Sequence, residues 1–232
     1  MQGIILAGGR GERLRPLTDE RPKCLVEVAG ETIVGYQLRW LAANGIVHAV
    51  ISCGYRAEMV RAAVGDGTRF GLRVSYAIEH EPLGSGGGLR LAAQGLAAGE
   101  EPIVAVNGDV LTALNLRTMA REHRKQRAAA TILLVPLVSE KGIVDLDGEG
   151  RITAFREKPP LPYLMNAGVY VMSGEALAAL PARGSVETHT WPSLARRGLL
   201  RGYPYRGMYC TVDSQKDLAT AEQRLSRRGL AR

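Results

Sequence analysis

The chain has 232 residues, of which 46% are hydrophobic and 23% charged, and its formal net charge is +7. This composition is ordinary for a globular protein and can bury the core of a single domain spanning residues 1–232. No window approaches the roughly 18 to 20 uninterrupted apolar residues that a membrane span needs, and the chain opens on a strand-like run rather than a signal peptide. We therefore expect a cytoplasmic protein with no membrane partner.

The three cysteines, Cys24, Cys53 and Cys210, are widely separated and form no CxxC pair. This set predicts neither a disulfide framework nor a zinc site, so we expect reduced thiols.

The positive charge alone fits nucleic acid, an acidic membrane surface or phosphate-rich small ligands. Aromatic and basic neighbours such as Tyr55-Arg56 are isolated and lack the repeated stacking platform of single-strand binders, so we expect no nucleic-acid partner. A basic cluster near the C-terminus is expected to be a solvated helix end. Its members are Arg224, Arg227, Arg228 and Arg232.

Short apolar runs alternate with helix-like segments along the first part of the chain, which is typical of a parallel sheet flanked by helices. The expected strands are 3–7, 48–52, 73–77, 102–107 and 130–137. The expected helices are 33–44, 57–64, 89–95 and 116–126.

From residue 142 the pattern changes, because two short apolar runs are separated by the hairpin-like turn Asp147-Gly148-Glu149-Gly150. An antiparallel flap is therefore expected over 143–156. The elements expected after it are strands at 166–172 and 209–212 and helices at 174–180, 191–197 and 215–227. Together these elements predict an α/β fold with three α/β/α layers, a Rossmann-like, mostly parallel mixed sheet and a small antiparallel flap.

The sharpest local signal is a phosphate loop, where the strand ending at Leu6-Ala7 runs directly into three glycines. Without Cβ atoms, the backbone N–H groups there can close around a phosphate while nearby basic side chains add positive charge. The glycines and basic residues concerned are Gly8, Gly9, Gly11, Arg10, Arg13 and Lys23. The spacing matches neither the dinucleotide fingerprint nor the Walker A loop, so a different phosphate loop is predicted.

The run from Gly8 to Val26 resembles the signature of the sugar-phosphate nucleotidyltransferases, or nucleotide-sugar pyrophosphorylases, which reads roughly GGxGxRLxPLTxxxPKxLxxV. The chain looks most like the mannose and heptose 1-phosphate guanylyltransferases among them. The resemblance implies the nucleotide-diphospho-sugar transferase fold. It also implies condensation of a nucleoside triphosphate with a hexose or heptose 1-phosphate, Mg²⁺ as cofactor, release of pyrophosphate, and compatibility with a homodimer.

Residues 79–89 resemble the family's second loop, in which a polar residue reads the base and small residues let base and sugar approach the backbone. The resemblance implies nucleotide contacts for residues of both loops and of the segment after the strand at 102–107. These are Leu6, Ala7, Gly8, Gly9, Arg10, Gly11, Glu79, Pro82, Gly84, Ser85, Asn107 and Gly108.

The segment Asn107-Gly108-Asp109 resembles the family's metal-binding turn, and a carboxylate at a strand's carboxyl end suits Mg²⁺, which shares its coordination with phosphates. Thr211 stands where the commonest version of the last motif has Asp, whereas some branches place the second ligand at the position of Asp213. Positions i and i+2 of a strand face the same side. We therefore expect Asp109 and Asp213 to be the metal ligands.

Segments 155–159 and 166–170 resemble two family motifs that hold the sugar 1-phosphate. The resemblance implies that Glu157 and Asn166 bond sugar hydroxyls, that Lys158 meets the sugar's phosphate, and that Gly87 lies at the sugar. Residues 1–137 are then mainly nucleotide-binding, and residues 138–232 mainly bind the sugar phosphate and supply the closing helix. His189, which follows a retained Glu187, receives no role.

The implied reaction is an in-line attack of a sugar phosphate oxygen on the α-phosphorus, which needs positioning and charge neutralisation rather than a nucleophilic side chain. The expected catalytic residues are Arg13, Lys23 and Lys158. Arg13 and Lys23 would stabilise the triphosphate and the leaving pyrophosphate, and Lys158 would hold the attacking phosphate. Loss of Arg13 is expected to reduce turnover most.

Glu79 stands where many relatives carry Gln, and an ionised carboxylate only accepts hydrogen bonds. Guanine offers two adjacent donors, N1–H and N2–H, whereas uracil and thymine offer one donor flanked by acceptors. GTP is therefore the expected nucleotide, although uridylyltransferases with a similar loop exist.

Two other functions remain open. One is nucleotidyl transfer to a non-sugar phosphate such as phosphocholine, which the departure at Thr211 allows. The other is a noncatalytic regulatory subunit that binds a sugar nucleotide. Glu157 and Asn166 favour a sugar, and the charges of Arg13 and Asp109 favour an active enzyme. We expect no further domain after the closing helix.

Overall fold

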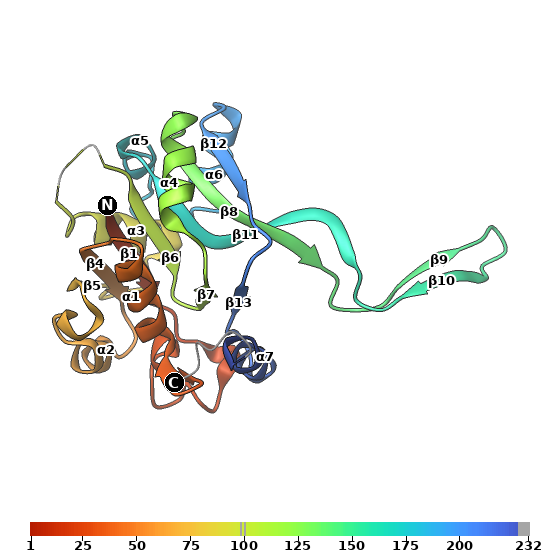
Figure 1. The fold of residues 1–232 in the computed structure, drawn as a ribbon, viewed down its shortest axis with the longest axis horizontal. Helices are drawn as coiled ribbons and strands as arrows, with labels where there is room; N and C mark the ends of the chain where they lie inside the picture. Colours follow the sequence, from red (N-terminus) through yellow and green to blue (C-terminus); the bar gives the residue numbers. More distant parts are fainter. Residues whose placement is uncertain (98, 100, 227–232) are drawn as a thin grey trace.

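The computed structural model describes residues 1–226 except 98 and 100, so Arg227, Arg228, Arg232 and the end of the expected closing helix lie outside the described residues. A seven-stranded sheet forms its centre, in the order β12-β8-β11-β6-β1-β4-β5 (Figure 1). The strands are β1 (Gln2–Ala7), β4 (His48–Cys53), β5 (Arg73–Ile78), β6 (Ile103–Asn107), β8 (Ala130–Val138), β11 (Pro160–Met172) and β12 (Leu200–Pro204). Neighbouring strands are parallel, except that β11 runs antiparallel to both β6 and β8. The predicted mostly parallel mixed sheet is confirmed.

Helices cover both faces of the sheet because successive strand residues such as Ile4 and Ile5 point to opposite sides. On the Ile5 side lie α1 (Ile33–Ala43), α2 (Ala57–Val64) and α4 (Leu116–Lys125). On the Ile4 side lie α3 (Gly84–Ala93), α5 (Gly174–Ala178) and α6 (Thr190–Arg196). The three-layer α/β/α architecture is confirmed. Among the described helices, none is both long and apolar enough to cross a membrane.

Short strands and the closing helix cover one end of the molecule, next to α1. β7 (Val110–Thr112) pairs with β13 (Tyr209–Thr211), and β2 (Glu27–Val28) pairs with β3 (Glu31–Thr32). The closing helix α7 (Gln215–Ser226) packs there through Ala221 and Leu225 in a third apolar cluster. Single 3-10 turns η1 (Glu12–Leu14), η2 (Lys23–Leu25) and η3 (Thr68–Phe70) complete the chain.

The predicted flap forms the tip of a long projection from the body, which we call the arm and define as residues 138–165. Its tip is the hairpin of β9 (Ile143–Leu146) and β10 (Ile152–Arg156), and Figure 1 shows it standing away from the layers. Since β6 and β8 both run antiparallel to β11, they end at the same edge of the sheet. The arm therefore leaves the body from the edge at which β6 ends.

Several expected boundaries were wrong. The helix expected at 89–95 begins at Gly84, because Gly86 and Gly87 allow a close approach that a side chain would block: a Cβ on either would lie 2.6 Å from Pro181 or Ala182. The strand expected at 166–172 begins at Pro160, where it pairs with the end of β8. The strands β7 and β12 were not predicted, and β13 pairs with β7 rather than joining the main sheet.

The start of α1 yields a stability prediction. Thr32 caps this helix, because its hydroxyl oxygen accepts a hydrogen bond of 3.1 Å from the Gly35 N–H. Thr32→Ala is expected to lower the free energy of unfolding by about 1 kcal/mol, whereas Thr32→Ser keeps the cap. Urea denaturation measures both variants, and equal midpoints for the two would contradict the capping role.

Candidate active site

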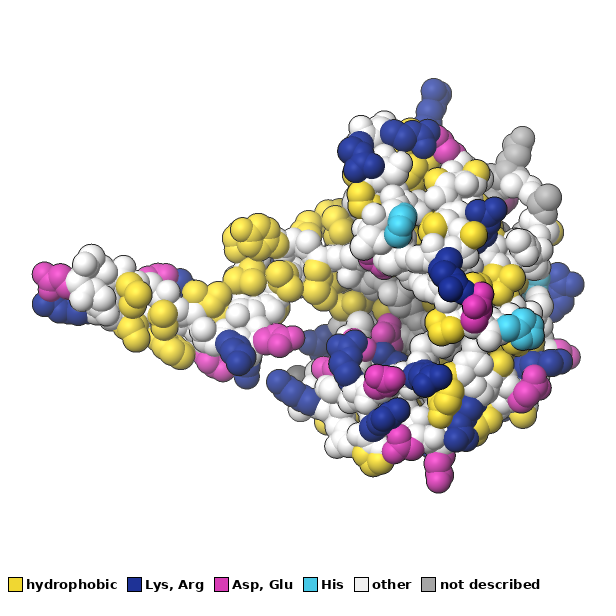
Figure 2. All heavy atoms as spheres, turned by 180° about the vertical axis from the view of Figure 1, so that it is seen from behind, with side chains coloured by type: hydrophobic (Ala, Val, Ile, Leu, Met, Phe, Trp, Pro, Cys, Tyr) yellow, Lys and Arg dark blue, Asp and Glu magenta, His cyan; other side chains and the backbone are white. Residues whose placement is uncertain are grey.

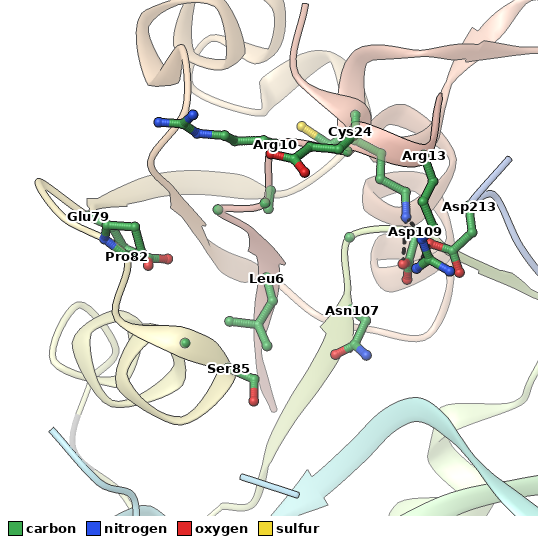
Figure 3. A pocket seen from close by; sticks show the side chains of 18 residues that line it. Leu6, Arg10, Arg13, Cys24, Glu79, Pro82, Ser85, Asn107, Asp109 and Asp213 are labelled. Carbon is green, nitrogen blue, oxygen red and sulfur yellow. Dashed lines mark hydrogen bonds and ion pairs between the residues drawn. The ribbon is translucent and has the colours of Figure 1, made fainter. Parts of the chain in front are cut away.

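A cavity of about 670 Å³ opens where β1 and β6 end (Figure 3). Its walls come from the loop after β1, η2, the loop between β5 and α3, the start of α3, the turn between β6 and β7, and Asp213 after β13. The lining residues are Leu6, Ala7, Gly8, Gly9, Arg10, Gly11, Glu12, Arg13, Lys23, Cys24, Glu79, Pro82, Gly84, Ser85, Asn107, Gly108, Asp109 and Asp213. They include all the residues predicted to contact the nucleotide, together with Arg13, Lys23 and both predicted metal ligands.

The glycine loop folds tightly against the segment that carries Lys23. Gly11 has a φ of +66°, and a Cβ there would lie 2.8 Å from the Lys23 Cβ. The Thr18 hydroxyl donates to the Gly11 carbonyl at 2.8 Å, which fixes the return of the chain. A residue with a side chain at position 11 would be strained and would push Lys23 away.

A charge cluster occupies one end of the cavity. The Lys23 ammonium donates to Asp109 Oδ2 at 2.8 Å and to Asp213 Oδ1 at 2.6 Å. The Arg13 guanidinium donates to the same Asp213 oxygen at 2.9 Å, and Figure 3 shows Arg13, Asp109 and Asp213 close together. The Lys23 side chain is only 15% exposed, whereas that of Arg13 is 76% exposed. Lys23 is therefore held in place, while Arg13 can turn towards a ligand.

Backbone hydrogen bonds hold the two carboxylates at this position. Gly108 N–H donates to the Leu6 carbonyl at 2.8 Å, and a Cβ on Gly108 would lie 2.4 Å from that oxygen. The N–H of Val212 donates to the Asp109 carbonyl at 3.0 Å, which ties the residue before Asp213 to the β6–β7 turn. Glycine at position 108 is thus needed for the turn to lie against β1.

Gln37 supports the same turn from α1. Its Nε2 donates to the carbonyls of Asn107 and Val110, at 2.8 and 2.9 Å, on either side of Asp109. The Gln37 side chain is only 2% exposed. A buried amide with two such bonds fixes the shape of the turn that presents Asp109.

The two carboxylates fit a divalent cation. Both already accept hydrogen bonds from one ammonium group, and carboxylate oxygens are the ligands that Mg²⁺ prefers. Among the described residues, no group of three or more His, Cys, Asp or Glu side chains is placed to hold a metal. Mg²⁺ usually keeps several waters and shares the rest of its coordination with phosphates, so two protein carboxylates suffice.

Glu79 lies at the opposite end of the cavity (Figure 3). Its Oε1 accepts from the Ser52 hydroxyl at 2.8 Å, and its Oε2 accepts from the Leu83 N–H at 3.3 Å. A Cβ on Gly8 would lie 2.6 Å from Oε1. An ionised carboxylate has about four acceptor sites, so Glu79 is oriented by the protein and retains acceptor capacity towards the cavity.

Four predicted site residues do not line the cavity. Gly87 is buried against the Ala182 carbonyl, 2.6 Å from where its Cβ would be. Asn166 donates to the Tyr170 hydroxyl at 3.0 Å, next to the end of β6. Glu157 and Lys158 form an exposed ion pair of 3.3 Å in the arm, between β10 and β11.

Sequence analysis missed residues that line or support the cavity. Glu12 and Cys24 are in its wall, and Ser52 and Gln37 fix Glu79 and the Asp109 turn. Ser52 precedes the end of a strand, where parallel sheets place ligands, so its position was a usable signal. Gln37 was detectable as a polar residue among the apolar positions of α1.

The cysteines carry no reactive thiolate at neutral pH. Burial raises the pKa of Cys24 to about 12, with a smaller contribution from neighbouring Cys53. Burial also raises the pKa values of Cys53 and Cys210 to about 11. All three are free and buried, so the cavity presents cations and carboxylates and its one cysteine stays protonated. Ionic chemistry on an anionic ligand fits this arrangement better than attack by sulfur.

Comparison with known proteins supports the family resemblance seen in the sequence. The family model described as nucleotidyl transferase matches residues 2–190. The mannose-1-phosphate guanyltransferase of Yarrowia lipolytica is 34% identical over 94% of this chain, and the mannose-1-phosphate guanylyltransferase of Mycobacterium tuberculosis is 35% identical over 96%. The chain spans 62% of the length of each of these relatives.

A solved structure has the same fold. HddC from Yersinia pseudotuberculosis superposes with a TM-score of 0.77 at 22% identity, covering 97% of this chain and 99% of HddC. A second structure of HddC, complexed with GMP-PN, superposes with a TM-score of 0.75 at 21% identity, covering 97% and 99% of the two chains.

The raised thiol pKa values give a labelling prediction. At pH 8 the three thiols stay protonated and buried in the folded protein, so iodoacetamide is expected to modify Cys24, Cys53 and Cys210 slowly. Unfolding in urea should make all three react rapidly. Intact-mass spectrometry over time measures this, and fast labelling of the native Cys24 would contradict its assignment as an unreactive thiol.

Proposed function

The chain belongs to the nucleotidyl transferase family, and on this premise we propose that it transfers a guanylyl group from GTP to a sugar 1-phosphate and releases pyrophosphate. The observation that carries the proposal is one cavity with a glycine loop and a cluster of Arg13, Lys23, Asp109 and Asp213 at its end. Phosphoryl-type transfer needs such positioning and charge neutralisation, and no nucleophilic side chain.

The basic side chains stabilise the negative charge of the phosphate groups in the proposed reaction. Lys23 is held by two carboxylates and provides a fixed positive charge next to the triphosphate. The exposed Arg13 can move to stabilise the negative charge that develops on the leaving pyrophosphate. The N–H groups of the loop from Gly8 to Gly11 bind phosphate oxygens without interference from side chains.

Asp109 and Asp213 would hold Mg²⁺, which when bound neutralises phosphate charge and orients the oxygens around the α-phosphorus. Hydrogen bonds from Gln37, Gly108 and Val212 support the backbone that carries Asp109 and Asp213, so both carboxylates are oriented before the substrate binds. The metal and its ligand set remain part of this proposal.

Mannose 1-phosphate is the first acceptor to test, because relatives over 30% identical are named for it. Asn166 beside the end of β6, and Glu157 and Lys158 in the arm between β10 and β11, are the proposed residues for the sugar and its phosphate. The cytoplasmic location, the division at residue 137 and the lack of a nucleic-acid partner stay predictions.

Pyrophosphate release coupled to inorganic pyrophosphatase tests the function. The protein is assayed with MgCl₂, each common nucleoside triphosphate in turn, and a panel of hexose and heptose 1-phosphates. Release is expected only when a nucleotide and a sugar 1-phosphate are both present, with GTP preferred. If folded protein releases no pyrophosphate with any pair of substrates, the proposal is contradicted. A non-sugar acceptor such as phosphocholine, or a noncatalytic subunit, is then favoured.

Arg13 gives the first mutational prediction. Arg13→Ala is expected to lower kcat about 100-fold or more, because a preorganised charge at the phosphates is lost. Arg15→Ala is the matched control, since Arg15 lies on the same loop outside the cavity and pairs with Asp19 at 3.2 Å. Equal kcat values for Arg13→Ala and Arg15→Ala would show that Arg13 has no role in the reaction.

Glu79 gives the second. Glu79→Gln replaces two acceptor oxygens by one acceptor and one donor, so the ratio of kcat/KM for GTP to that for UTP should fall about 10-fold or more. Glu81→Gln is the control, because Glu81 lies on the same loop, outside the cavity, and pairs with Arg183. An unchanged ratio in Glu79→Gln would mean that another group reads the base.

A further inference from the structure

The four groups that pair directly at one end of the cavity balance one another in charge. Lys23 donates to Asp109 Oδ2 at 2.8 Å and to Asp213 Oδ1 at 2.6 Å, and Arg13 donates to the same Asp213 oxygen at 2.9 Å. Two positive charges therefore face two negative charges. The paired groups offer no net negative charge to a further cation.

Lys23 is the cation that bonds to both carboxylates, and packing fixes its position. A Cβ on Gly11 would lie 2.8 Å from the Lys23 Cβ, so the glycine loop lies directly against the start of this side chain. The Lys23 side chain is 15% exposed, whereas that of Arg13 is 76% exposed and bonds to one carboxylate. Water therefore screens the charge of Arg13 more strongly than the charge of Lys23.

The two carboxylates form a sufficient site for a divalent cation only together with other oxygen ligands. Mg²⁺ gives up its water reluctantly and is usually held by one or two carboxylates and by substrate phosphates. A divalent cation at Asp109 and Asp213 would also be repelled by the ammonium group that bonds to both of them. The additional negative charge must come from a ligand.

A nucleoside triphosphate supplies this charge. The glycine loop and the charge cluster line the same cavity, so phosphate oxygens bound at the loop would share one space with the two carboxylates. These oxygens attract the divalent cation and can also pair with Lys23 and Arg13. Binding of the cation and binding of the triphosphate therefore favour each other, and this coupling is reciprocal.

We infer that Lys23 makes binding of the divalent cation depend on the nucleotide. Its ammonium group keeps the free cation from Asp109 and Asp213, and the cation binds together with the triphosphate. Because the metal and the nucleotide belong to the proposed reaction, this role of Lys23 rests on the proposed function. It adds to the part that Lys23 has in stabilising the triphosphate.

Electron paramagnetic resonance of Mn²⁺ tests this role on protein without nucleotide. Mn²⁺ takes the same oxygen ligands as Mg²⁺, and the signal of the free ion is lost when the ion binds. The wild type is expected to leave Mn²⁺ free up to millimolar concentration. Lys23→Met, which removes the ammonium group, is expected to bind Mn²⁺ at least about 10-fold more tightly, because the repulsion from a poorly screened charge is lost.

Two variants separate the position of Lys23 from net charge. Lys23→Arg keeps the positive charge and is expected to bind Mn²⁺ as weakly as the wild type. Arg13→Met is the charge-matched control, since it removes one positive charge from an exposed side chain, and its affinity for Mn²⁺ should stay within about 3-fold of the wild type. Arg13→Met that binds Mn²⁺ as tightly as Lys23→Met overturns the inference.

Surface carboxylates must be distinguished from the site, because acidic and basic side chains are interspersed over the face of the body seen in Figure 2. Asp213→Asn added to Lys23→Met is expected to abolish the acquired Mn²⁺ binding. Asp19→Asn added to Lys23→Met is the matched control and should keep it, since Asp19 is exposed and lies outside the cavity. Equal affinities of the two double variants would place the bound Mn²⁺ elsewhere and overturn the inference.

Thermal unfolding checks the fold of these variants and gives a second measurement. Lys23→Met leaves two carboxylates without their shared counter-ion, so its Tm is expected below that of the wild type and should rise when MnCl₂ is added. The Tm of the wild type should not respond to MnCl₂. A wild type that binds free Mn²⁺ tightly, or Lys23→Met that binds it no more tightly than the wild type, overturns the inference.

Equilibrium dialysis of labelled GTP tests the coupling to the nucleotide. Without sugar phosphate, the wild type is expected to bind GTP more tightly with MnCl₂ than with EDTA, and equal affinities would overturn the inference. Failure of the proposed function is recognised separately, as absence of pyrophosphate release. A wild type that releases pyrophosphate but binds free Mn²⁺ tightly would overturn the role of Lys23 and leave the proposed function intact.

Discussion

The cavity depends on the contact of Lys23 with Asp109 and Asp213, because that contact joins three distant parts of the chain. The ammonium comes from the segment after the glycine loop, one carboxylate from the end of β6 and the other from the end of β13. All three side chains are less than a quarter exposed, so the charges are poorly screened and each needs the others. The same arrangement leaves two carboxylates and two cations, Lys23 and Arg13, facing one space. Polyphosphate and a divalent metal are the ligands that suit it.

The scaffold supports this contact with backbone geometry rather than with further charges. Gly108 lies against β1, Gln37 bonds both sides of the Asp109 turn, and Val212 ties that turn to the β13 segment. Glu79 is fixed in the same manner by Ser52 at the opposite end. The two ends of the cavity are therefore rigid, while the exposed Arg13 is the part that can adapt to a ligand. This division fits a reaction in which charge moves towards a leaving group.

The sequence predicted those features that are local. The glycine loop, the carboxylate after β6 and the alternation of strands and helices each lie within one short segment, and the structure brings their residues to one cavity. It did not predict β7, because a three-residue strand shows no usable periodicity. A strand was expected at 209–212, but its pairing with β7, which brings Asp213 near Asp109, is a long-range contact that the local pattern does not reveal. It also mistook the glycines that begin α3 for a loop, since their role is close packing. The sequence also did not predict that the arm projects from the body, because the projection depends on the long-range pairing of β8 with β11.

In the proposed reaction, charge and positioning in this cavity drive one direct displacement, with no covalent intermediate. Isotope exchange tests it most directly: the protein is incubated with GTP, MgCl₂ and labelled pyrophosphate, with and without mannose 1-phosphate, and label entering GTP is counted. Exchange is expected only when the sugar 1-phosphate is present, since pyrophosphate leaves only as the sugar phosphate attacks. Exchange without any sugar phosphate would reveal a nucleotidyl-enzyme intermediate and rule out direct displacement.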